Sequence, residues 1–348
     1  MKHRVLVVGG GSIGARHVRC LLETGRCEVG VCEPRPKVRA ELASRHGLVA
    51  EYETIDQALD RPWDAAVVAT PATHHVRIAR RLAEQGIDLL IEKPLAVDEA
   101  GIPELADTAE SRGVLVAVAY VYRAHPALRS MRAAIESGRF GGPLQVVAVS
   151  GQPFAHLRPA YRDIYYAHHD QGGGAIQDGV THVFNSVEWL VGPITRLAVD
   201  AQHLSLEGVS VEDTVHVMAR HRESVMASYA VNHHQAPNES TLTVVCEHGT
   251  LRLEIKRHLW KWVAEPLGQW IERPTEVREH DDWFRLQEHA FLDCVETRGE
   301  PLCSLHEGWQ TLRVNRAALR SAREDGAWQR VASPVQPGAP AREPQGVR

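Results

Sequence analysis

Apolar and polar positions alternate in blocks over the first 122 residues. Short runs of valine, leucine, isoleucine and alanine, bounded by turn residues, occupy 5–8, 28–32, 65–69, 89–91 and 114–119. Amphipathic stretches with helical periodicity lie between them, at 14–24, 36–46, 54–59, 75–85 and 97–111. Continuous apolar runs are typical of strands buried on both faces of a parallel sheet. The order of runs therefore predicts a doubly wound α/β domain over residues 1–122.

The pattern changes after residue 123. A helical stretch at 126–137 precedes an apolar run at 144–150, and the polar, aromatic segment 152–171 then has little periodicity. Runs in which apolar and polar residues alternate follow at 196–201, 211–221, 224–232, 240–246, 250–255 and 260–264. Such alternation is typical of antiparallel strands with one buried face. Residues 123–330 are therefore expected to form an α+β domain for substrate binding and oligomerisation, with a mainly antiparallel, open-faced sheet.

Three more helices are predicted in this second domain. The first is opened by the Gly172-Gly173-Gly174 corner and runs to about 191, and the others cover 281–297 and 306–324. The proline-rich segment 331–348 is predicted to be a disordered tail.

Composition narrows the class of protein. The 348 residues carry a formal net charge of -5, which argues against a dedicated nucleic-acid binder with a basic surface. The most apolar run, 114–122, is far shorter than the roughly 20 residues that a membrane-spanning helix needs. The N-terminus lacks a signal-peptide pattern, and the 6 cysteines form no C-x-x-C pair. We therefore expect a cytoplasmic protein with free thiols.

A glycine-rich motif follows the first apolar run directly. Gly9, Gly11 and Gly14 satisfy G-x-G-x-x-G, with Ser12 and Ile13 inside the loop. The first glycine permits a tight turn, the second lets a pyrophosphate approach the main chain, and the third lets helix and strand pack closely. The N–H groups of the following helix can then bind the phosphates. The motif predicts a dinucleotide site in a Rossmann domain.

The predicted cofactor is NAD. Glu33 closes the second predicted strand, where a carboxylate can bind the adenosine ribose hydroxyls and repel the 2′-phosphate of NADP. Arg35, Lys37 and Arg39 follow closely and could neutralise such a phosphate, although they also fit a solvated helix face. NADP therefore stays an alternative.

Two buried strands, 65–69 and 89–91, end in short motifs at the sheet edge where ligands of open α/β folds bind. The residues of these two ends that are candidate cofactor contacts are Thr70, Pro71, His75, Glu92 and Lys93. Pro94 restricts Lys93 to an extended main chain, which directs its side chain. A solvated surface charge is the alternative for Lys93, and a helix start is the alternative for His75.

Asp178 and His182 are four positions apart in the helix after the glycine corner. On an α-helix this spacing places both side chains on one face. A carboxylate beside an imidazole fixes its tautomer and raises its basicity, so that it can act as a general base near neutral pH. A buried histidine hydrogen-bonded to a helix carboxylate has the same spacing, so the spacing leaves both interpretations open.

These motifs, in this order, resemble the Gfo/Idh/MocA oxidoreductases, the family of glucose–fructose oxidoreductase and inositol dehydrogenase. The resemblance covers roughly residues 3–325. Its elements are the glycine loop, both strand-end motifs, Tyr122-Arg123 with Pro126, the glycine corner with Asp178 and His182, and a last helix with Ala317 and Ser321. The resemblance implies catalytic roles for Lys93, Asp178 and His182, and a sugar, polyol or sugar derivative as substrate.

Two positions depart from the family pattern. Many members read Asp-x-Gly-x-His, whereas here Gly179 stands one place earlier. Many also carry an acid three residues after the histidine, where this chain has Asn185. The first departure can alter the helix start, and the second can change a substrate contact.

The predicted reaction is reversible hydride transfer between NAD(P) and a secondary alcohol, with no metal. His182, oriented by Asp178, takes the hydroxyl proton, and Lys93 hydrogen-bonds the carbinol oxygen. Predicted substrate contacts are Arg123, Arg158, Tyr161, Arg162, Tyr165 and His182. Arg158 and Arg162 suit a carboxylate or phosphate on the substrate. Side chains that only face solvent are the alternative for both, and the sequence favours neither interpretation.

Three alternatives to this reaction remain. Some relatives cleave glycosidic bonds through transient oxidation by tightly held NAD, and a non-catalytic dinucleotide-binding sensor would keep the same fold. Metal-assisted hydrolysis is the third, with His168, His169, Asp170, His233 and His234 as ligands. Adjacent histidines make poor chelating pairs, which disfavours it. The open sheet face also predicts a homodimer or homotetramer, with no nucleic-acid or membrane partner.

Overall fold

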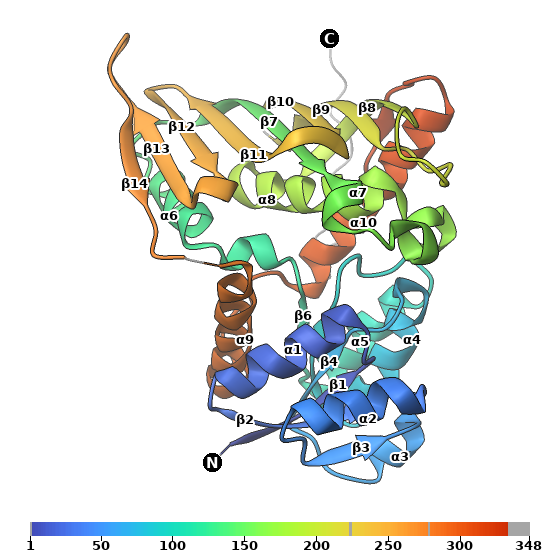
Figure 1. Ribbon diagram of the computed structural model, residues 1–348. Helices are drawn as coiled ribbons and strands as arrows, with labels where there is room; N and C mark the ends of the chain where they lie inside the picture. Colours follow the sequence, from blue (N-terminus) through green and yellow to red (C-terminus); the bar gives the residue numbers. More distant parts are fainter. Residues whose placement is uncertain (1, 223–224, 278, 333–348) are drawn as a thin grey trace.

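A computed structural model describes residues 2–222, 225–277 and 279–332. The predicted tail lies almost entirely outside these residues. Two sheets, each with its own helices, lie one above the other in Figure 1, and the chain crosses between them after β6. None of the helices in the described ranges combines the length and the apolarity that crossing a bilayer requires.

The first sheet is parallel throughout the described residues. Its strand order is β3-β2-β1-β4-β5-β6, so the order reverses between β1 and β4. The strands are β1 (His3–Val8), β2 (Cys27–Cys32), β3 (Ala50–Tyr52), β4 (Ala65–Val68), β5 (Asp88–Ile91) and β6 (Val116–Val118). All four residues of β4 and of β5 are buried, as expected of strands covered on both faces. The predicted doubly wound fold is confirmed.

Helices cover both faces of this sheet. They are α1 (Ser12–Glu23), α2 (Pro36–Arg45), α3 (Ile55–Leu59), α4 (Ala72–Ala83) and α5 (Ile102–Arg112). Helix α5 starts later than predicted, because Gly101 adopts a left-handed conformation and Pro103 occupies the first turn. Another covering helix comes from much later in the chain. Helix α9 (His280–Thr297) lies beside α1 in Figure 1, and its Phe291 and Leu292 join the core of the first domain.

The second sheet is mainly antiparallel, as predicted. Its order is β14-β13-β12-β11-β7-β10-β9-β8-β15, and only the β7–β10 pair among these described strands is parallel. The strands are β7 (Pro143–Pro153), β8 (Ile194–Gln202), β9 (Thr214–His221), β10 (Met226–Asn232), β11 (His234–Cys246), β12 (Gly249–Glu254), β13 (Leu259–Val263), β14 (Ile271–Pro274) and β15 (Gln329–Arg330).

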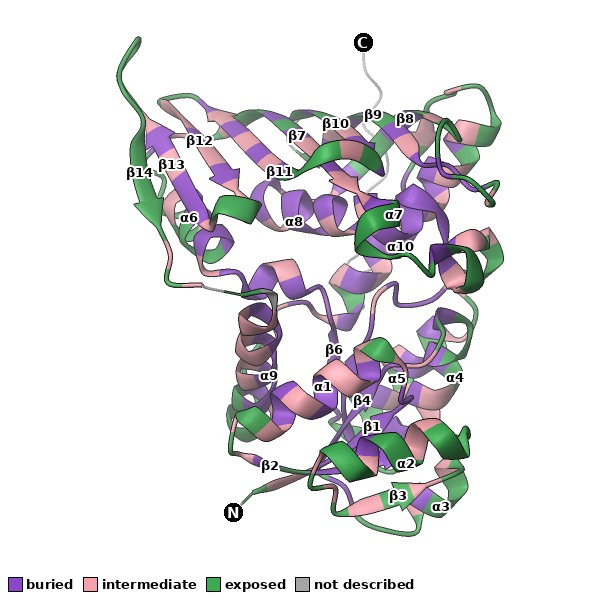
Figure 2. Ribbon diagram, viewed as in Figure 1, coloured by how far each residue is buried: buried purple, intermediate pink, exposed green. Residues whose placement is uncertain are grey.

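One face of this sheet is covered and the other is open. Helices α6 (Pro126–Glu136), α8 (Thr181–Val191) and α10 (Leu305–Arg323) lie on the covered side, where the strands contribute buried residues (Figures 1 and 2). Exposed and buried positions alternate along β10, with Met226 51% exposed. The sheet therefore presents apolar side chains on its outer face as well.

Short turns connect these elements around the domain boundary. A 3-10 turn, Val121–Ala124, leads from β6 to α6. The segment after β7 holds α7 (Phe154–Leu157) and the 3-10 turns Tyr161–Asp163, Tyr165–Ala167 and His169–Gln171. A π-helical turn, Ile176–Val180, then precedes α8, and the 3-10 turn Ile255–Arg257 follows β12.

Candidate active site

The glycine loop closes tightly over the end of β1. Gly9 has a φ of +101°, and a Cβ built on it would lie 2.6 Å from the carbonyl oxygen of Ala69. A Cβ on Gly14 would lie 1.9 Å from the carbonyl oxygen of Gly9. Only glycine fits at these two positions.

The first turn of α1 has space for an anion. A Cβ built on Gly11, the N-cap residue, would have no atom within 4 Å, and no side chain caps the helix. Ser12 is exposed beside it and Ile13 is half-buried. The first N–H groups of a helix lack intrahelical partners and carry its positive dipole end. These residues therefore fit the pyrophosphate of NAD, which Gly9, Gly11, Ser12, Ile13 and Gly14 would hold.

Glu33 lies buried at the end of β2, directly beside this loop. Its carboxylate accepts hydrogen bonds from Gly10 N–H at 2.7 Å and from Nε of Arg35 at 2.7 Å. Burial opposes ionisation, but these bonds outweigh it and hold the pKa of Glu33 below its ordinary value. Arg39 donates to the carbonyl oxygen of Glu33, whereas Lys37 is exposed. The ionised carboxylate thus lies where the adenosine ribose is predicted to bind.

His75 joins the ends of β4 and β5. Its ring is buried, with Nε2 2.7 Å from the carbonyl oxygen of Thr70 and Nδ1 3.1 Å from that of Pro94. Burial lowers the pKa of His75, so the ring favours its neutral form, in which only one nitrogen donates. Pro71 is exposed next to these contacts. The predicted wall of the cofactor site is therefore held together by this imidazole.

Lys93 and Asp178 meet across the two domains. The Lys93 Nζ lies 3.0 Å from Asp178 Oδ1 and 3.2 Å from the Asp178 carbonyl oxygen. Lys93 follows β5, and Asp178 belongs to the π-helical turn before α8. Both side chains are largely buried, at 12% and 4% exposure. The structure thus joins the two motifs that the sequence predicted to act together.

Two further side chains reach the same carboxylate. Tyr165 donates its hydroxyl to Asp178 Oδ1 at 2.6 Å, and Nη1 of Arg158 lies 3.6 Å from Oδ2. Burial raises the pKa of Asp178, but the charges of Lys93 and Arg158 and the hydrogen bonds outweigh it and hold the pKa well below its ordinary range. Burial lowers the pKa of Lys93, and the Asp178 charge more than reverses this. The pair is therefore an ammonium and a carboxylate at neutral pH.

His182 lies in the first turn of α8, against aromatic rings. Its imidazole stacks on Tyr122 with ring centroids 4.8 Å apart, and it meets Tyr120 edge-on at 6.0 Å. Tyr122 is half-buried near Lys93. Desolvation raises the pKa of the Tyr122 hydroxyl, and the Lys93 charge opposes this rise. Asp178 lies in a π-helical turn, which has more residues per turn than an α-helix. A spacing of four residues therefore does not place Asp178 and His182 on one face as it would in a regular α-helix. The orientation of His182 by Asp178 stays a prediction.

Gly179 leaves room for another buried imidazole. A Cβ on Gly179 would lie 2.9 Å from Nε2 of His233. The His233 ring stacks on Phe154 with centroids 4.4 Å apart, and its Nδ1 is 2.6 Å from the Tyr166 hydroxyl. This packing accounts for the glycine that stands one place early in the family pattern.

Arg123 and Asn185 form a separate buried network. Arg123 Nε donates to Asn185 Oδ1 at 2.7 Å, and its Nη1 contacts Leu302 O and Glu307. The guanidinium also covers the Trp189 ring. These contacts favour a structural role for Arg123 over the predicted substrate contact. Asn185, the second departure from the family pattern, is part of the same network.

Tyr161 and Arg162 bind a neighbouring loop. The Tyr161 hydroxyl donates to the Glu207 carbonyl oxygen at 2.6 Å, and Arg162 Nε donates to the same oxygen at 2.8 Å. Tyr161 is buried with Phe154 in a small aromatic core. Of the predicted substrate contacts, the structure therefore brings Arg158, Tyr165 and His182 to the Lys93 region, and directs the others elsewhere.

The histidines of the metal alternative have separate partners. His169 pairs with Glu212, His233 with Tyr166, and His234 lies 2.9 Å from the Thr214 hydroxyl. Over residues 2–222, 225–277 and 279–332, no group of three or more histidine, cysteine or acidic side chains is arranged to hold a metal ion.

Two residues of this region are not predicted as site residues by the sequence. Tyr122 belongs only to the family resemblance, and His17 to none of the motifs. His17 lies three residues after Gly14, on the helix face that also carries buried Val18 and Leu21. A histidine on an otherwise apolar face is the signal that could have identified it.

A two-domain body with a glycine loop at the sheet switch point and a lysine–aspartate pair between its domains defines an NAD-dependent oxidoreductase fold. Residues 3–120 match the model of the oxidoreductase family with an NAD-binding Rossmann fold, and residues 128–252 match the GFO/IDH/MocA C-terminal domain. The chain belongs to the Gfo/Idh/MocA family of NAD-dependent oxidoreductases, which confirms the predicted family, fold and cofactor.

Named relatives are similar to this chain over different lengths. A myo-inositol dehydrogenase of Streptomyces leeuwenhoekii is 30% identical over 62% of this chain and 65% of its own length. The rhizopine catabolism protein MocA of Rhizobium meliloti is 30% identical over 55% of this chain and 58% of its own length. The chain thus spans about three fifths of these two relatives. An inositol 2-dehydrogenase of Saccharopolyspora erythraea is 28% identical over 94% of this chain and 95% of its own.

A solved structure has the same fold over almost the whole chain. Levoglucosan dehydrogenase in complex with NADH and levoglucosan superposes with a TM-score of 0.86, covering 95% of this chain and 100% of that one at 21% identity.

Proposed function

We propose that this protein catalyses reversible hydride transfer between NAD and a secondary alcohol of a sugar, polyol or sugar derivative. The observation that carries the proposal is the Lys93–Asp178 pair, which spans the two domains at the carboxyl edge of the parallel sheet. Tyr165 and Arg158 surround the pair, and Tyr122 links it to His182. Ligands of open α/β sheets bind at this edge, next to the switch point.

The side chains have complementary roles in this reaction. Asp178 keeps Lys93 charged and holds its Nζ in place, so that the ammonium can hydrogen-bond the carbinol oxygen and stabilise negative charge that develops there. His182 takes the hydroxyl proton as the carbon loses its hydride, and the oxygen becomes a ketone carbonyl. In the reverse direction His182 returns the proton. NAD, when bound, supplies the hydride acceptor.

The substrate class is supported by the relatives and by the polar surroundings of Lys93. Relatives named myo-inositol, D-apiose and levoglucosan dehydrogenases all oxidise carbohydrate or polyol substrates by name. Arg158 is 48% exposed in its side chain, so part of the guanidinium remains available to a substrate oxygen. Tyr165 offers a second polar group beside it.

The test is a panel of sugars and polyols, including myo-inositol and levoglucosan, scanned for reduced nicotinamide. We expect at least one to yield NADH in proportion to ketone formed. Glycoside cleavage without net NADH would favour the transient-oxidation alternative. Tight NAD binding with no turnover of any member would favour the sensor.

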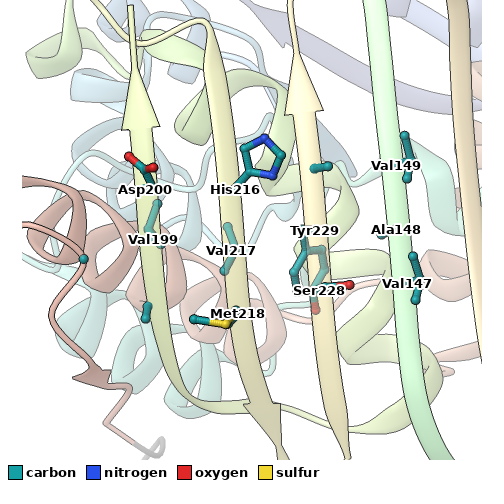
Figure 3. A pocket seen from close by; sticks show the side chains of 13 residues that line it. Val147, Ala148, Val149, Val199, Asp200, His216, Val217, Met218, Ser228 and Tyr229 are labelled. Atoms are coloured by element: carbon teal, nitrogen blue, oxygen red, sulfur yellow. The ribbon is translucent and has the colours of Figure 1, made fainter.

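The open sheet face supports self-association into a dimer or tetramer. Ala198, Met218, Ser228 and Val147 form one cross-strand row there, and Figure 3 shows Met218 and Val147 on this face. Met218 is 59% exposed and Val147 38%. Contiguous exposed apolar patches commonly mark protein interfaces. Light scattering that shows a monomer at micromolar concentration would contradict this proposal.

A cytoplasmic location is supported by the thiols. Cys20, Cys27, Cys32, Cys246, Cys294 and Cys303 are all free and buried. Free thiols persist in reducing compartments. Fractionation of the source cells, followed by immunodetection of the protein, tests this location.

A further inference from the structure

A buried cluster of three ionisable groups lies behind Lys93. His17 is fully buried on α1, with Nδ1 2.5 Å from Glu288 Oε1 and Nε2 2.9 Å from Glu92 Oε1. Glu288 belongs to α9, and Glu92 directly follows β5. The cluster therefore joins the helix of the glycine loop, the segment after β5 that carries Lys93, and helix α9.

The number of protons that the three groups share follows from their geometry. A neutral imidazole carries one N–H, but here both ring nitrogens face a carboxylate oxygen. Each contact therefore requires its own proton, and the three groups together carry one negative charge. Burial disfavours the charged ring, but Glu288 and Glu92 more than compensate and raise the pKa of His17 to about 10. The ring thus donates to both carboxylates across the physiological pH range.

The cluster continues to the main chain of Lys93. The second oxygen of Glu92, Oε2, accepts the Lys93 main-chain N–H at 3.0 Å. Glu288 Oε2, by contrast, has no hydrogen-bond partner within the described ranges. The hydrogen bonds from His17 therefore lead through Glu92 to Lys93.

We propose that His17 is a positioning residue that, through Glu92, fixes the main chain of Lys93 and so directs its ammonium group to Asp178. The importance of Lys93 for turnover rests on the proposed function, whereas its position can be tested without any substrate. A contribution to stability is a weaker explanation of the cluster, because buried ion pairs are often no better than apolar side chains of similar size. To hold Lys93 in one position, by contrast, requires the specific hydrogen bonds that the His17 ring makes.

Two substitutions of His17 separate the two carboxylates. In His17→Gln the side-chain amide nitrogen lies near the place of Nε2 and can still donate to Glu92, whereas in His17→Asn it lies near that of Nδ1 and can donate only to Glu288. Both remove the positive charge. His74→Gln, at an exposed position of α4, is the matched control.

The readout is the acetylation rate of Lys93 by limiting acetic anhydride, measured by peptide mass spectrometry relative to exposed Lys37. Release from Asp178 lowers the pKa of Lys93 and exposes it. We expect the ratio of the Lys93 to the Lys37 acetylation rate to rise about threefold or more in His17→Asn. This is the factor that a fall of about half a unit in the pKa of Lys93 gives. The ratio should stay near the wild-type value in His17→Gln and His74→Gln. NAD+ affinity, measured by calorimetry, should change little in all three.

Turnover gives a second readout. With any panel substrate that the wild type oxidises, kcat of His17→Asn should fall about 10- to 100-fold, as a displacement of roughly 1 Å in a reacting group does. His17→Gln should lose less, and KM for NAD+ should stay near its wild-type value in both. A wild type that oxidises no sugar contradicts the proposed function, while the acetylation ratio still decides the role of His17.

Equal acetylation of Lys93 in His17→Asn and His17→Gln overturns the proposal and leaves the cluster a structural role. If neither variant folds, Glu92→Ala and Glu288→Ala provide a second comparison, because each removes one partner of His17 but only Glu92 contacts Lys93. Higher acetylation in Glu92→Ala alone supports the proposal. Equal acetylation in these two variants contradicts it.

Discussion

The ammonium of Lys93 lies 3.0 Å from the carboxylate of Asp178, although the two residues are 85 positions apart and belong to different domains. This pair places one charged donor at the carboxyl edge of the nucleotide-binding sheet, next to the end of β4 held by His75. It also makes the site depend on the relative position of the two sheets.

Lys93 and His182 should serve one oxygen atom of the substrate. We expect Lys93→Met and His182→Asn each to lower kcat about 10²–10⁴-fold, because each removes a positioned acid–base or donor group. The double variant should lose little more than the worse single one. Steady-state kinetics on a panel substrate measures all three, with Lys37→Met at an exposed position as control. Near-wild-type turnover in either single variant rejects the mechanism.

Arg158 and Arg162, two of the three arginines predicted to bind substrate, should behave differently from each other. Arg158→Gln is expected to raise KM for the sugar about 10-fold, since a hydrogen bond from a charged group to the substrate would be lost. Arg162→Gln should leave KM nearly unchanged, because that guanidinium binds the Glu207 carbonyl. Equal effects of the two substitutions would contradict this difference between the arginines.

Glu33 should set the preference for NAD. Glu33→Ala removes the negative charge beside the ribose site and frees Arg35 from its ion pair. The affinity for NADP relative to NAD is then expected to rise about 10-fold or more, because a like-charge contact costs several kcal/mol. Calorimetric titration with each cofactor measures the ratio. An unchanged ratio would mean that the carboxylate does not contact the ribose.

Glu188 should make the protein less stable as the pH rises. The carboxyl is buried among Gln310, Thr311 and the Ile194 N–H, and burial raises its pKa from 4.5 to about 7. The folded state therefore keeps this proton up to about pH 7, whereas the unfolded chain loses it near pH 4.5. Raising the pH through this window removes stability, by about 3 kcal/mol at most.

Glu188→Gln should abolish this loss. The amide keeps an acceptor for the Ile194 N–H, and the Thr311 hydroxyl has an alternative acceptor in the Glu307 carbonyl oxygen. We expect a higher Tm than wild type at pH 8 and a similar Tm at pH 5. Glu207→Gln, at a side chain that is 90% exposed, should change neither. A Glu188→Gln variant less stable than wild type at pH 8 would mean that the carboxylate is tolerated.

Gly179 should tolerate no side chain. In Gly179→Ala the new methyl group would lie 2.9 Å from the buried His233 ring, so the π-helical turn or the ring must shift. Overpacking of this kind costs about 1–3 kcal/mol. We expect a lower Tm and, because Asp178 is the preceding residue, a lower kcat. Gly47→Ala, where a Cβ meets no atom within 4 Å, should change neither value.

The sequence by itself determined the two sheets and the glycine loop. The strands of the first sheet were recognisable because both of their faces are buried, so that nearly every position of β4 and β5 must be apolar. The strands of the second sheet alternate because only one face is covered. Gly14 follows from a close approach within the loop, where a Cβ would meet the Gly9 carbonyl oxygen, and Gly9 from the approach of the Ala69 carbonyl oxygen just after β4. All three features depend on burial or on main-chain contacts, and not on which distant side chain packs alongside.

Tertiary structure decided which polar side chains meet. Arg123 and Arg158 are the same residue type, yet one is buried against Asn185 and the other faces Asp178. Glu92, a predicted cofactor contact, bonds His17, which is 75 positions away. A charged side chain can be buried only where an opposite charge or a hydrogen-bond partner meets it. That partner comes from whichever distant element packs alongside, so the direction of each polar group is set by packing and not by its local sequence.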